Sequence, residues 1–306
     1  MSNFIIIIVC LGLGILLRRT NVFPVNADKS INQFIIYISL PAMILYHLPQ
    51  VTFDSSSVIP IATSWMVFAG SYLFFSFLAW LKSWPEKVTV CLIITAGLGN
   101  TSFIGFPVIE TLVGSEGLQY AIMADQPGTF LILTTVGLFL IKKATQSSSS
   151  IIDTIKGLFL FPPFMAFIVG LMINYFGIVM PEALSLALLG IAGTVSPLAL
   201  FSVGLQLKWP KQHIYLPFLS FGLLYKLILA PLLTLLVWYV LAGKTGMEVT
   251  VSILEAAMAP MITAAIIVAT YKIKSNLATM MIGIGIPLSI FSLAIWYYVL
   301  TLLGLL

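Results

Sequence analysis

The sequence predicts an all-α membrane protein with ten transmembrane helices, arranged as two inverted five-helix repeats whose broken helices 4 and 9 cross. Three observations support this fold class: long apolar runs, the distribution of the basic residues, and matching interruptions in the two halves of the chain. Of the 306 residues, 60% are hydrophobic and only 8% are charged, whereas a soluble domain has about 25% charged residues. The composition therefore excludes a soluble globular protein.

The apolar runs predict the membrane spans. A spanning helix needs about 20 mostly apolar residues. The first run is short, but Arg18 and Arg19 follow it rather than precede it, which is the opposite of a secretory signal peptide. We therefore interpret it as a first span that enters from the outer side. The ten predicted spans are 3–17, 31–48, 58–81, 88–113, 117–141, 157–177, 181–207, 214–242, 249–271 and 277–305.

The basic residues orient these spans. All of the 14 Lys and Arg lie in odd-numbered connectors except Lys244, which lies in an even-numbered connector, and Lys226, which lies inside a span. Cytoplasmic loops carry the excess of Lys and Arg. We therefore expect a multi-pass protein of the plasma membrane, with both termini on the outer side and the central loop in the cytoplasm. The net charge of +4 then reflects membrane orientation, so no nucleic-acid partner is expected.

A long polar connector, residues 144–156, divides the chain into a first five-helix repeat at 1–143 and a second at 157–306. Features recur in the same order in both; for example, Pro127 in span 5 corresponds to Pro287 in span 10. A repeat with an odd number of spans ends on the opposite side of the membrane, so its copy is inserted upside down. Inverted repeats are typical of secondary transporters, and a structural bundle or receptor with accidental symmetry is the alternative.

Spans 4 and 9 contain corresponding interruptions, which predict the site. Corresponding interruptions are the best sequence indication of a transporter's binding site. A broken helix turns free N–H groups and a partial positive charge toward the middle of the membrane, which favours an anion. The alternative is a pair of simple kinks in continuous helices. The predicted substrate-binding residues are Gly99, Asn100 and Thr101 of span 4, Ala259, Pro260 and Met261 of span 9, and Lys226 of span 8.

Ionisable side chains inside the membrane usually have a function or a partner, and four lie within the predicted spans. Glu110 lies near the outer end of span 4, so we interpret it as an interfacial residue. Asp125 and Glu255 are predicted to bind a coupling proton or cation, with Na⁺ near Asn100 and Glu255 as one option. Lys226 either supplies positive charge to the substrate or forms a buried ion pair with one of the acids.

The interrupted spans resemble those of the auxin efflux carrier family, including its bacterial members. The resemblance rests on Gly99-Asn100-Thr101 followed by Gly105 and Pro107, on Asp125-Gln126, and on Ala256-Ala257-Met258 followed by Pro260. It implies a bile-acid-symporter-like fold with a scaffold domain from spans 1, 2, 6 and 7. A transport domain from spans 3–5 and 8–10 would move like an elevator within a homodimer. Plant carriers have a proline at the position of Gly99, so the resemblance implies small carboxylates such as malate and malonate rather than auxin.

The function predicted from the sequence is secondary active transport of a small organic anion across the lipid bilayer by alternating access. The expected coupling ion is H⁺ or Na⁺, and no other cofactor and no resident metal are expected. A transporter-like sensor that binds its ligand without moving it remains the alternative. A membrane enzyme is less favoured, because the phosphate-loop, zinc-ligand and nucleophile-elbow patterns do not occur in the sequence.

Overall fold

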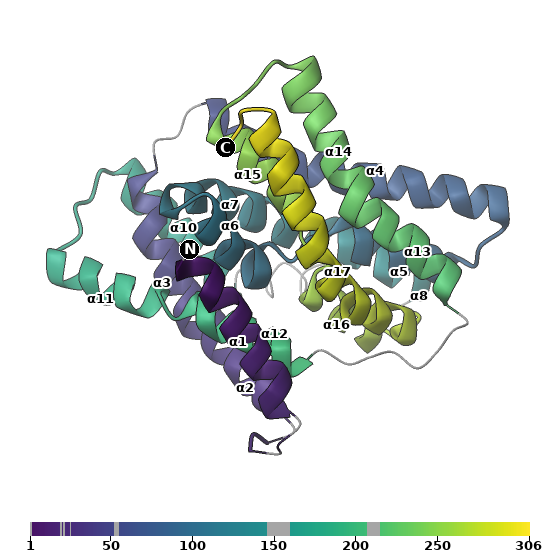
Figure 1. Cartoon of the computed structure of the whole chain (residues 1–306), viewed down its shortest axis with the longest axis horizontal. Helices are drawn as coiled ribbons and strands as arrows, with labels where there is room; N and C mark the ends of the chain where they lie inside the picture. The colour runs from purple at the N-terminus through teal and green to yellow at the C-terminus, as the bar shows by residue number, and fades with distance from the viewer. Residues whose placement is uncertain are drawn as a thin grey trace. The chain divides into compact units, whose positions relative to one another are not determined.

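The computed structural model describes residues 2–18, 20, 22–24, 26–51, 55–145, 160–206 and 215–306, and the regular structure in these ranges is helical (Figure 1). The all-α prediction is thus confirmed. Most of the predicted connector 144–156 lies outside the described residues. Among the described residues, six helices are long and apolar enough to cross a membrane: Ala27–Gln50, Ser55–Lys82, Ser115–Thr145, Glu182–Leu205, Leu216–Leu241 and Ser275–Leu302.

The predicted count of ten spans is not confirmed by these helix lengths. Shorter apolar helices occupy Val9–Arg18, Thr101–Leu112 and Pro162–Tyr175. Predicted span 4 is divided between a helix that ends at Gly97 and helical turns that begin at Thr101. An interrupted span contains no single long helix, so length alone cannot count it.

The chain forms two compact units, each built from three stretches of sequence. Unit 1 comprises Met1–Asp54, Ser102–Ile122 and Lys156–Leu207, and unit 2 comprises Ser55–Thr101, Met123–Ile155 and Lys208–Leu306. The chain passes between the units inside predicted spans 4 and 5. The assignment of a scaffold domain and a transport domain stays a prediction.

Unit 1 is held together by close helix packing and a few polar contacts. Glu110, interpreted from the sequence as interfacial, is half-buried and accepts a hydrogen bond from Ser196 Oγ at 2.9 Å. The hydroxyls of Ser39 and Thr194 are 2.7 Å apart. The helices that contribute to this unit are α1 (Ser2–Arg18), α2 (Ala27–Phe34), α3 (Leu40–His47), α6 (Phe106–Leu112), α7 (Leu118–Ala124), α10 (Pro162–Tyr175), α11 (Glu182–Ala192) and α12 (Val195–Gln206).

The closest packing in unit 1 is between α1 and α12, which lie side by side (Figure 1). A Cβ atom added to Gly204 of α12 would lie 2.9 Å from the Cα atom of Gly14 in α1. The two backbones therefore touch directly, as they do where small residues pair between membrane helices.

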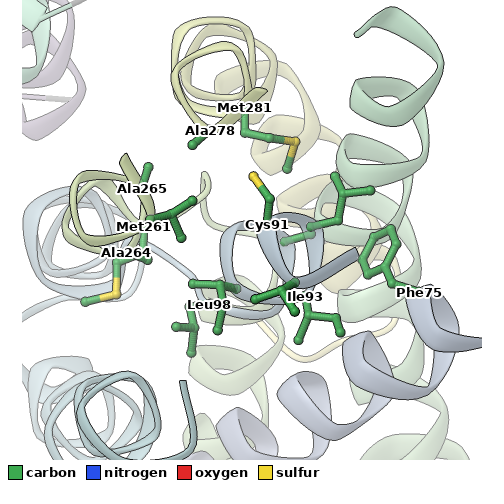
Figure 2. Packing of buried hydrophobic residues seen from close by; sticks show 14 of the residues in the cluster. Phe75, Cys91, Ile93, Leu98, Met261, Ala264, Ala265, Ala278 and Met281 are labelled. Carbon is green, nitrogen blue, oxygen red and sulfur yellow. The ribbon is translucent and has the colours of Figure 1, made fainter. Parts of the chain in front are cut away.

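Unit 2 is built around α5, which is buried on all sides from Val88 to Gly97. Figure 2 shows Cys91, Ile93 and Leu98 packed among side chains of neighbouring helices such as Met261 and Met281. This apolar core fixes the end of α5 and the chain that follows it. The α-helices of unit 2 are α4 (Val58–Lys82), α5 (Glu86–Gly97), α8 (Leu138–Thr145), α13 (Leu216–Leu224), α14 (Ala230–Leu235), α15 (Met247–Ala256), α16 (Ile262–Thr270) and α17 (Ser275–Leu302).

The contact between α1 and α12 predicts that Gly204→Ala destabilises the protein by about 1–3 kcal/mol, because the added methyl group forces two backbones apart. Gly190→Ala in α11 is the matched control. A Cβ at Gly190 meets nothing within 4 Å, so this change should be neutral or slightly stabilising. Thermal unfolding of the purified protein in detergent measures both variants, and equal melting temperatures would contradict the proposed packing.

Candidate functional site

Two helices of unit 2 are interrupted where the sequence predicts it. After Gly97 ends α5, Leu98 is extended with φ −113° and ψ 125°. Between α15 and α16, Met261 is extended with φ −67° and ψ 122°. Interior glycine costs about 1 kcal/mol and proline about 3 kcal/mol in a helix, so both local sequences favour a break. Gly99 and Pro260 then face each other in an isolated antiparallel bridge.

The two interruptions cross through reciprocal backbone hydrogen bonds. The Asn100 amide N–H donates to the Ala259 carbonyl at 2.8 Å, and the Met261 amide N–H donates to the Leu98 carbonyl at 3.1 Å. Each interruption thereby satisfies peptide groups that the other leaves without a helical partner. The sequence-based expectation that these amide hydrogens are free for an anion is therefore wrong for Asn100 and Met261.

The side chain of Asn100 provides a donor that the backbone does not. Asn100 is 2% exposed. Its Nδ2 atom has no hydrogen-bond partner among the described residues. A buried donor without a partner carries the full cost of its desolvation, so a ligand acceptor placed beside it would recover that free energy.

The Asp125 carboxylate is hydrogen-bonded through both of its oxygens. Thr101 Oγ1 donates to Oδ1, and Gln126 Nε2 donates to Oδ2 at 2.6 Å. Thr129, one helical turn after Asp125, places its hydroxyl 2.8 Å from that of Thr101. Asp125 is thus a buried acceptor that holds Thr101, the first residue after the interruption of span 4.

Span 5, which carries Asp125, has an interruption of its own. Gly128 lies inside a π-helical turn with a non-helical ψ of −107°. The neighbouring α4 binds the carbonyls at this kink: Ser64 Oγ donates to Ala124 at 2.9 Å, and Trp65 Nε1 donates to Pro127 at 3.1 Å. A Cβ at Gly128 would lie 2.6 Å from Ser64 Oγ, so only glycine allows α4 to come this close.

Lys226 lies in a π-helical turn between α13 and α14 and is 1% exposed. Its Nζ donates to the carbonyl of Ala256, the last residue of α15, at 3.0 Å. A Cβ at Gly99 would lie 3.0 Å from the same Nζ and 3.1 Å from the Glu255 carbonyl. Gly99 therefore gives the ammonium room beside the end of α15, and the hydrogen bond of Lys226 goes to a backbone carbonyl rather than to an acid.

Glu255, in the last turn of α15, is 3% exposed, and neither carboxylate oxygen has a hydrogen-bond partner among the described residues. It interacts electrostatically with Lys226 and Asp125. The cavity beside it has a volume of about 10 Å³, about the room that one water molecule needs. Its polar lining consists of Thr63, Ser64, Thr101, Thr129, Lys226, Ser252 and Glu255.

Unit 2 contains all of the predicted site residues. Thr101, Lys226 and Glu255 line one cavity. Asp125 contacts Thr101, and the segments around Gly99 and Pro260 cross beside Lys226. Within the described part of the chain, no three His, Cys, Asp or Glu side chains are grouped as metal ligands would be. Sequence reasoning missed Gln126, Thr129, Ser252 and Ser64 as members of the site.

A usable signal existed for two of these residues. Thr129 follows Asp125 by four positions and Ser252 precedes Glu255 by three, so each shares a helix face with a membrane acid. Ser64 gave no comparable signal, because its role depends on how α4 packs against the kink in span 5.

A crossing of two discontinuous helices with buried charges beside it defines the class of the protein, because such crossings form the binding sites of membrane transporters. Comparison with known proteins also indicates a membrane transporter. The family model described as membrane transport protein matches residues 1–297, and the chain therefore belongs to this family, that of the auxin efflux carriers. It is a multi-pass membrane protein.

Two relatives that match nearly the whole chain are also described as transporters. The chain is 29% identical over 303 residues to an uncharacterized transporter of Methanothermobacter thermautotrophicus, with 96% of each chain covered. It is 26% identical over 319 residues to an uncharacterized transporter of Methanocaldococcus jannaschii, with 98% of each chain covered.

The Asp125 network predicts a stability effect of Thr101→Val. This change keeps the shape of the side chain but removes one donor from the buried carboxylate, so stability should fall by about 1–3 kcal/mol. Thr279→Val on the exposed face of α17 is the control, since Thr279 Oγ1 donates to the Ser275 carbonyl of its own helix. Thermal unfolding in detergent compares the two, and an equal loss in both variants would show that Thr101 does not support Asp125.

Proposed function

We propose that the protein is a secondary active transporter of small organic anions, carboxylates of the malate or malonate kind, that works by alternating access. Membership in a transporter family favours transport over membrane enzymology. The observation that supports an anionic substrate most directly is the position of the buried Lys226 ammonium beside the crossing. The proposal includes ten spans, both termini on the outer side of the membrane, and a homodimer.

Side-chain groups, rather than the crossing amides, would bind the carboxylate. The Asn100 Nδ2 atom is a buried donor without a partner, and α16 begins at Ile262 directly after the crossing with its N-terminal partial positive charge. Lys226 adds a full positive charge close by. A hydrogen bond to a charged group contributes about 1.5–3 kcal/mol, so these groups together favour a carboxylate over a neutral solute.

An elevator-like movement of the site is supported by the fact that its residues all belong to one structural unit. The crossing, Asp125, Lys226 and Glu255 all belong to unit 2, although they come from separate stretches of the chain. An elevator-like carrier moves its binding site as one body, which requires that the ligand-binding groups share a unit. The cavity of about 10 Å³ is far too small for a dicarboxylate, so the cycle must include conformations in which the site is wider.

Glu255 is the better candidate for coupling, and Asp125 the better candidate for a structural role. Both Asp125 oxygens accept hydrogen bonds, whereas both Glu255 oxygens are open. A buried carboxyl with open oxygens can take up a proton and release it during the cycle without breaking other contacts. We therefore assign proton coupling to Glu255 and the positioning of Thr101 to Asp125.

The proposed function predicts saturable uptake of radiolabelled malonate or malate into proteoliposomes that contain the purified protein. Asn100→Ala should lower uptake at subsaturating substrate by about 10-fold or more, because it removes a charge-assisted hydrogen bond. Asn276→Ala, at an exposed position of α17, is the control and should transport normally.

The same preparation separates transport from sensing. Carboxylate-dependent thermal stabilisation without uptake would favour the sensor alternative. Neither stabilisation nor uptake with any small carboxylate, under proton or Na⁺ gradients, would reject the proposed function.

The coupling assignment predicts that Glu255→Gln abolishes the stimulation of uptake by an inwardly directed proton gradient, because the amide cannot carry the proton. Glu248→Gln, in the first turn of the same helix, should keep the stimulation. Asp125→Asn should instead lower the melting temperature, since its new NH₂ group would face the Gln126 donor. Uptake with and without a protonophore measures the coupling, and stimulation that persists in Glu255→Gln would remove Glu255 from this role.

A further inference from the structure

The C-terminal end of α15 is an arrangement that attracts a cation. α15 ends at Ala256, and the end of a helix carries a partial negative charge on its carbonyl oxygens. The carboxyl side chain of Glu255 lies in the same last turn and lacks hydrogen bonds. In transporters with discontinuous helices, such half-helix ends and unwound carbonyls coordinate Na⁺ or H⁺.

The position beside this helix end is filled by the protein itself. Lys226 Nζ donates to the Ala256 carbonyl at 3.0 Å, and Gly99 leaves room for the ammonium. The turn that carries Lys226 is held from two other helices. Tyr225 donates its hydroxyl to the Val67 carbonyl of α4 at 2.5 Å, and Trp296 Nε1 of α17 donates to the Leu227 carbonyl at 2.9 Å.

We propose that Lys226 is a tethered cation: its ammonium permanently fills a monovalent-cation position at the Ala256 carbonyl, near the Glu255 carboxylate, whose oxygens stay without a hydrogen-bond partner among the described residues. The wild-type protein then binds no Na⁺ at this position, and removal of the ammonium uncovers a Na⁺ site. The inference deepens the proposed function, because it explains why a proton rather than Na⁺ is assigned to Glu255. The conclusion about the coupling ion rests on the proposed function, whereas the cation position itself does not.

The groups that would remain after truncation of Lys226 suit Na⁺. They are oxygen atoms, which hard cations prefer: the Ala256 carbonyl, the Glu255 carboxylate, and the hydroxyls of Ser252, Thr101 and Thr129 that line the same cavity. The cavity of about 10 Å³ has room for about one water molecule. Loss of the lysine side chain enlarges it enough for a cation and a water.

The charge balance around the crossing gives a reason for this arrangement. Two acids, Asp125 and Glu255, are buried in unit 2 with Lys226. A mobile cation would have to be bound and released in each cycle, and its binding would depend on its concentration on either side. An ammonium on a flexible side chain supplies three donors and one charge at a fixed place, so the site keeps its affinity for an anion without a metal ion.

Two variants of Lys226 test the inference. Lys226→Ala removes the ammonium and leaves space, whereas Lys226→Met removes the charge but fills the space with an apolar side chain. Thermal unfolding of detergent-purified protein is measured in NaCl and in N-methyl-D-glucamine chloride at equal ionic strength. We expect Na⁺ to raise the melting temperature of Lys226→Ala by about 2 °C or more, and to leave wild type and Lys226→Met unchanged.

Equilibrium binding of ²²Na⁺ provides the second readout, with binding to Lys226→Ala that is lost in Lys226→Ala combined with Glu255→Gln. A folded Lys226→Ala that neither binds nor is stabilised by Na⁺ overturns the inference. If this variant does not fold, the wild-type protein still tests the inference. Stabilisation of wild type by Na⁺ that is lost in Glu255→Gln would show that Lys226 does not fill the position. Failure of the proposed function would appear only as missing carboxylate uptake, which neither readout measures.

Discussion

The reciprocal pairing of two interrupted backbones is the constraint on which the site depends. Peptide groups that a broken helix releases at membrane depth have no water to bind, and each costs several kcal/mol when it stays unpaired. Here the N–H groups of Asn100 and Met261 and the carbonyls of Leu98 and Ala259 satisfy one another. The crossing is therefore stable without a ligand, and the breaks in α5–α6 and α15–α16 hold each other in place.

The backbone pairing also determines which polar groups near the crossing are left without a partner. Because the central amides are used within the protein, the proposed ligand would be bound by side chains that surround the crossing. Asn100 and Glu255 have buried polar atoms without partners, and Lys226 approaches through the space that Gly99 leaves. Asp125 differs from them, since its oxygens are engaged by Thr101 and Gln126. Two membrane acids that look alike in the sequence, Asp125 of span 5 and Glu255 of span 9, thus have different surroundings.

The sequence was sufficient for the all-α membrane class and for the places where predicted spans 4 and 9 break. Apolar composition and the local cost of Gly97, Gly99 and Pro260 are properties of the sequence itself, and the structure is helical with interruptions at these residues. The pairing of the freed amides could not be predicted, because it depends on how two segments far apart in sequence meet. The number of spans is not settled by helix length for a related reason, since an interrupted span has no single long helix.

Two prolines that correspond in the repeat show the same limit. Pro127 lies in a kinked π-helical turn of span 5, whereas Pro287 lies inside the continuous α17. A proline in a helix removes one hydrogen bond and leaves carbonyls that need other partners. Ser64 and Trp65 of α4 bind the carbonyls at Ala124 and Pro127, and Gly128 provides the space. The outcome is therefore decided by the neighbouring helix and not by the proline.

The two halves also differ in the charged residues beside the crossing. The backbone crossing treats the two halves alike, with one N–H donated in each direction. The charged residues differ between the halves. In predicted span 3, α4 has no charged residue before Lys82, whereas span 8, its predicted counterpart, carries the buried Lys226. A symmetric frame thus holds one positive charge on one side of the crossing, at the end of α15. Under the proposed function, an anion at the crossing would meet that charge from a single direction.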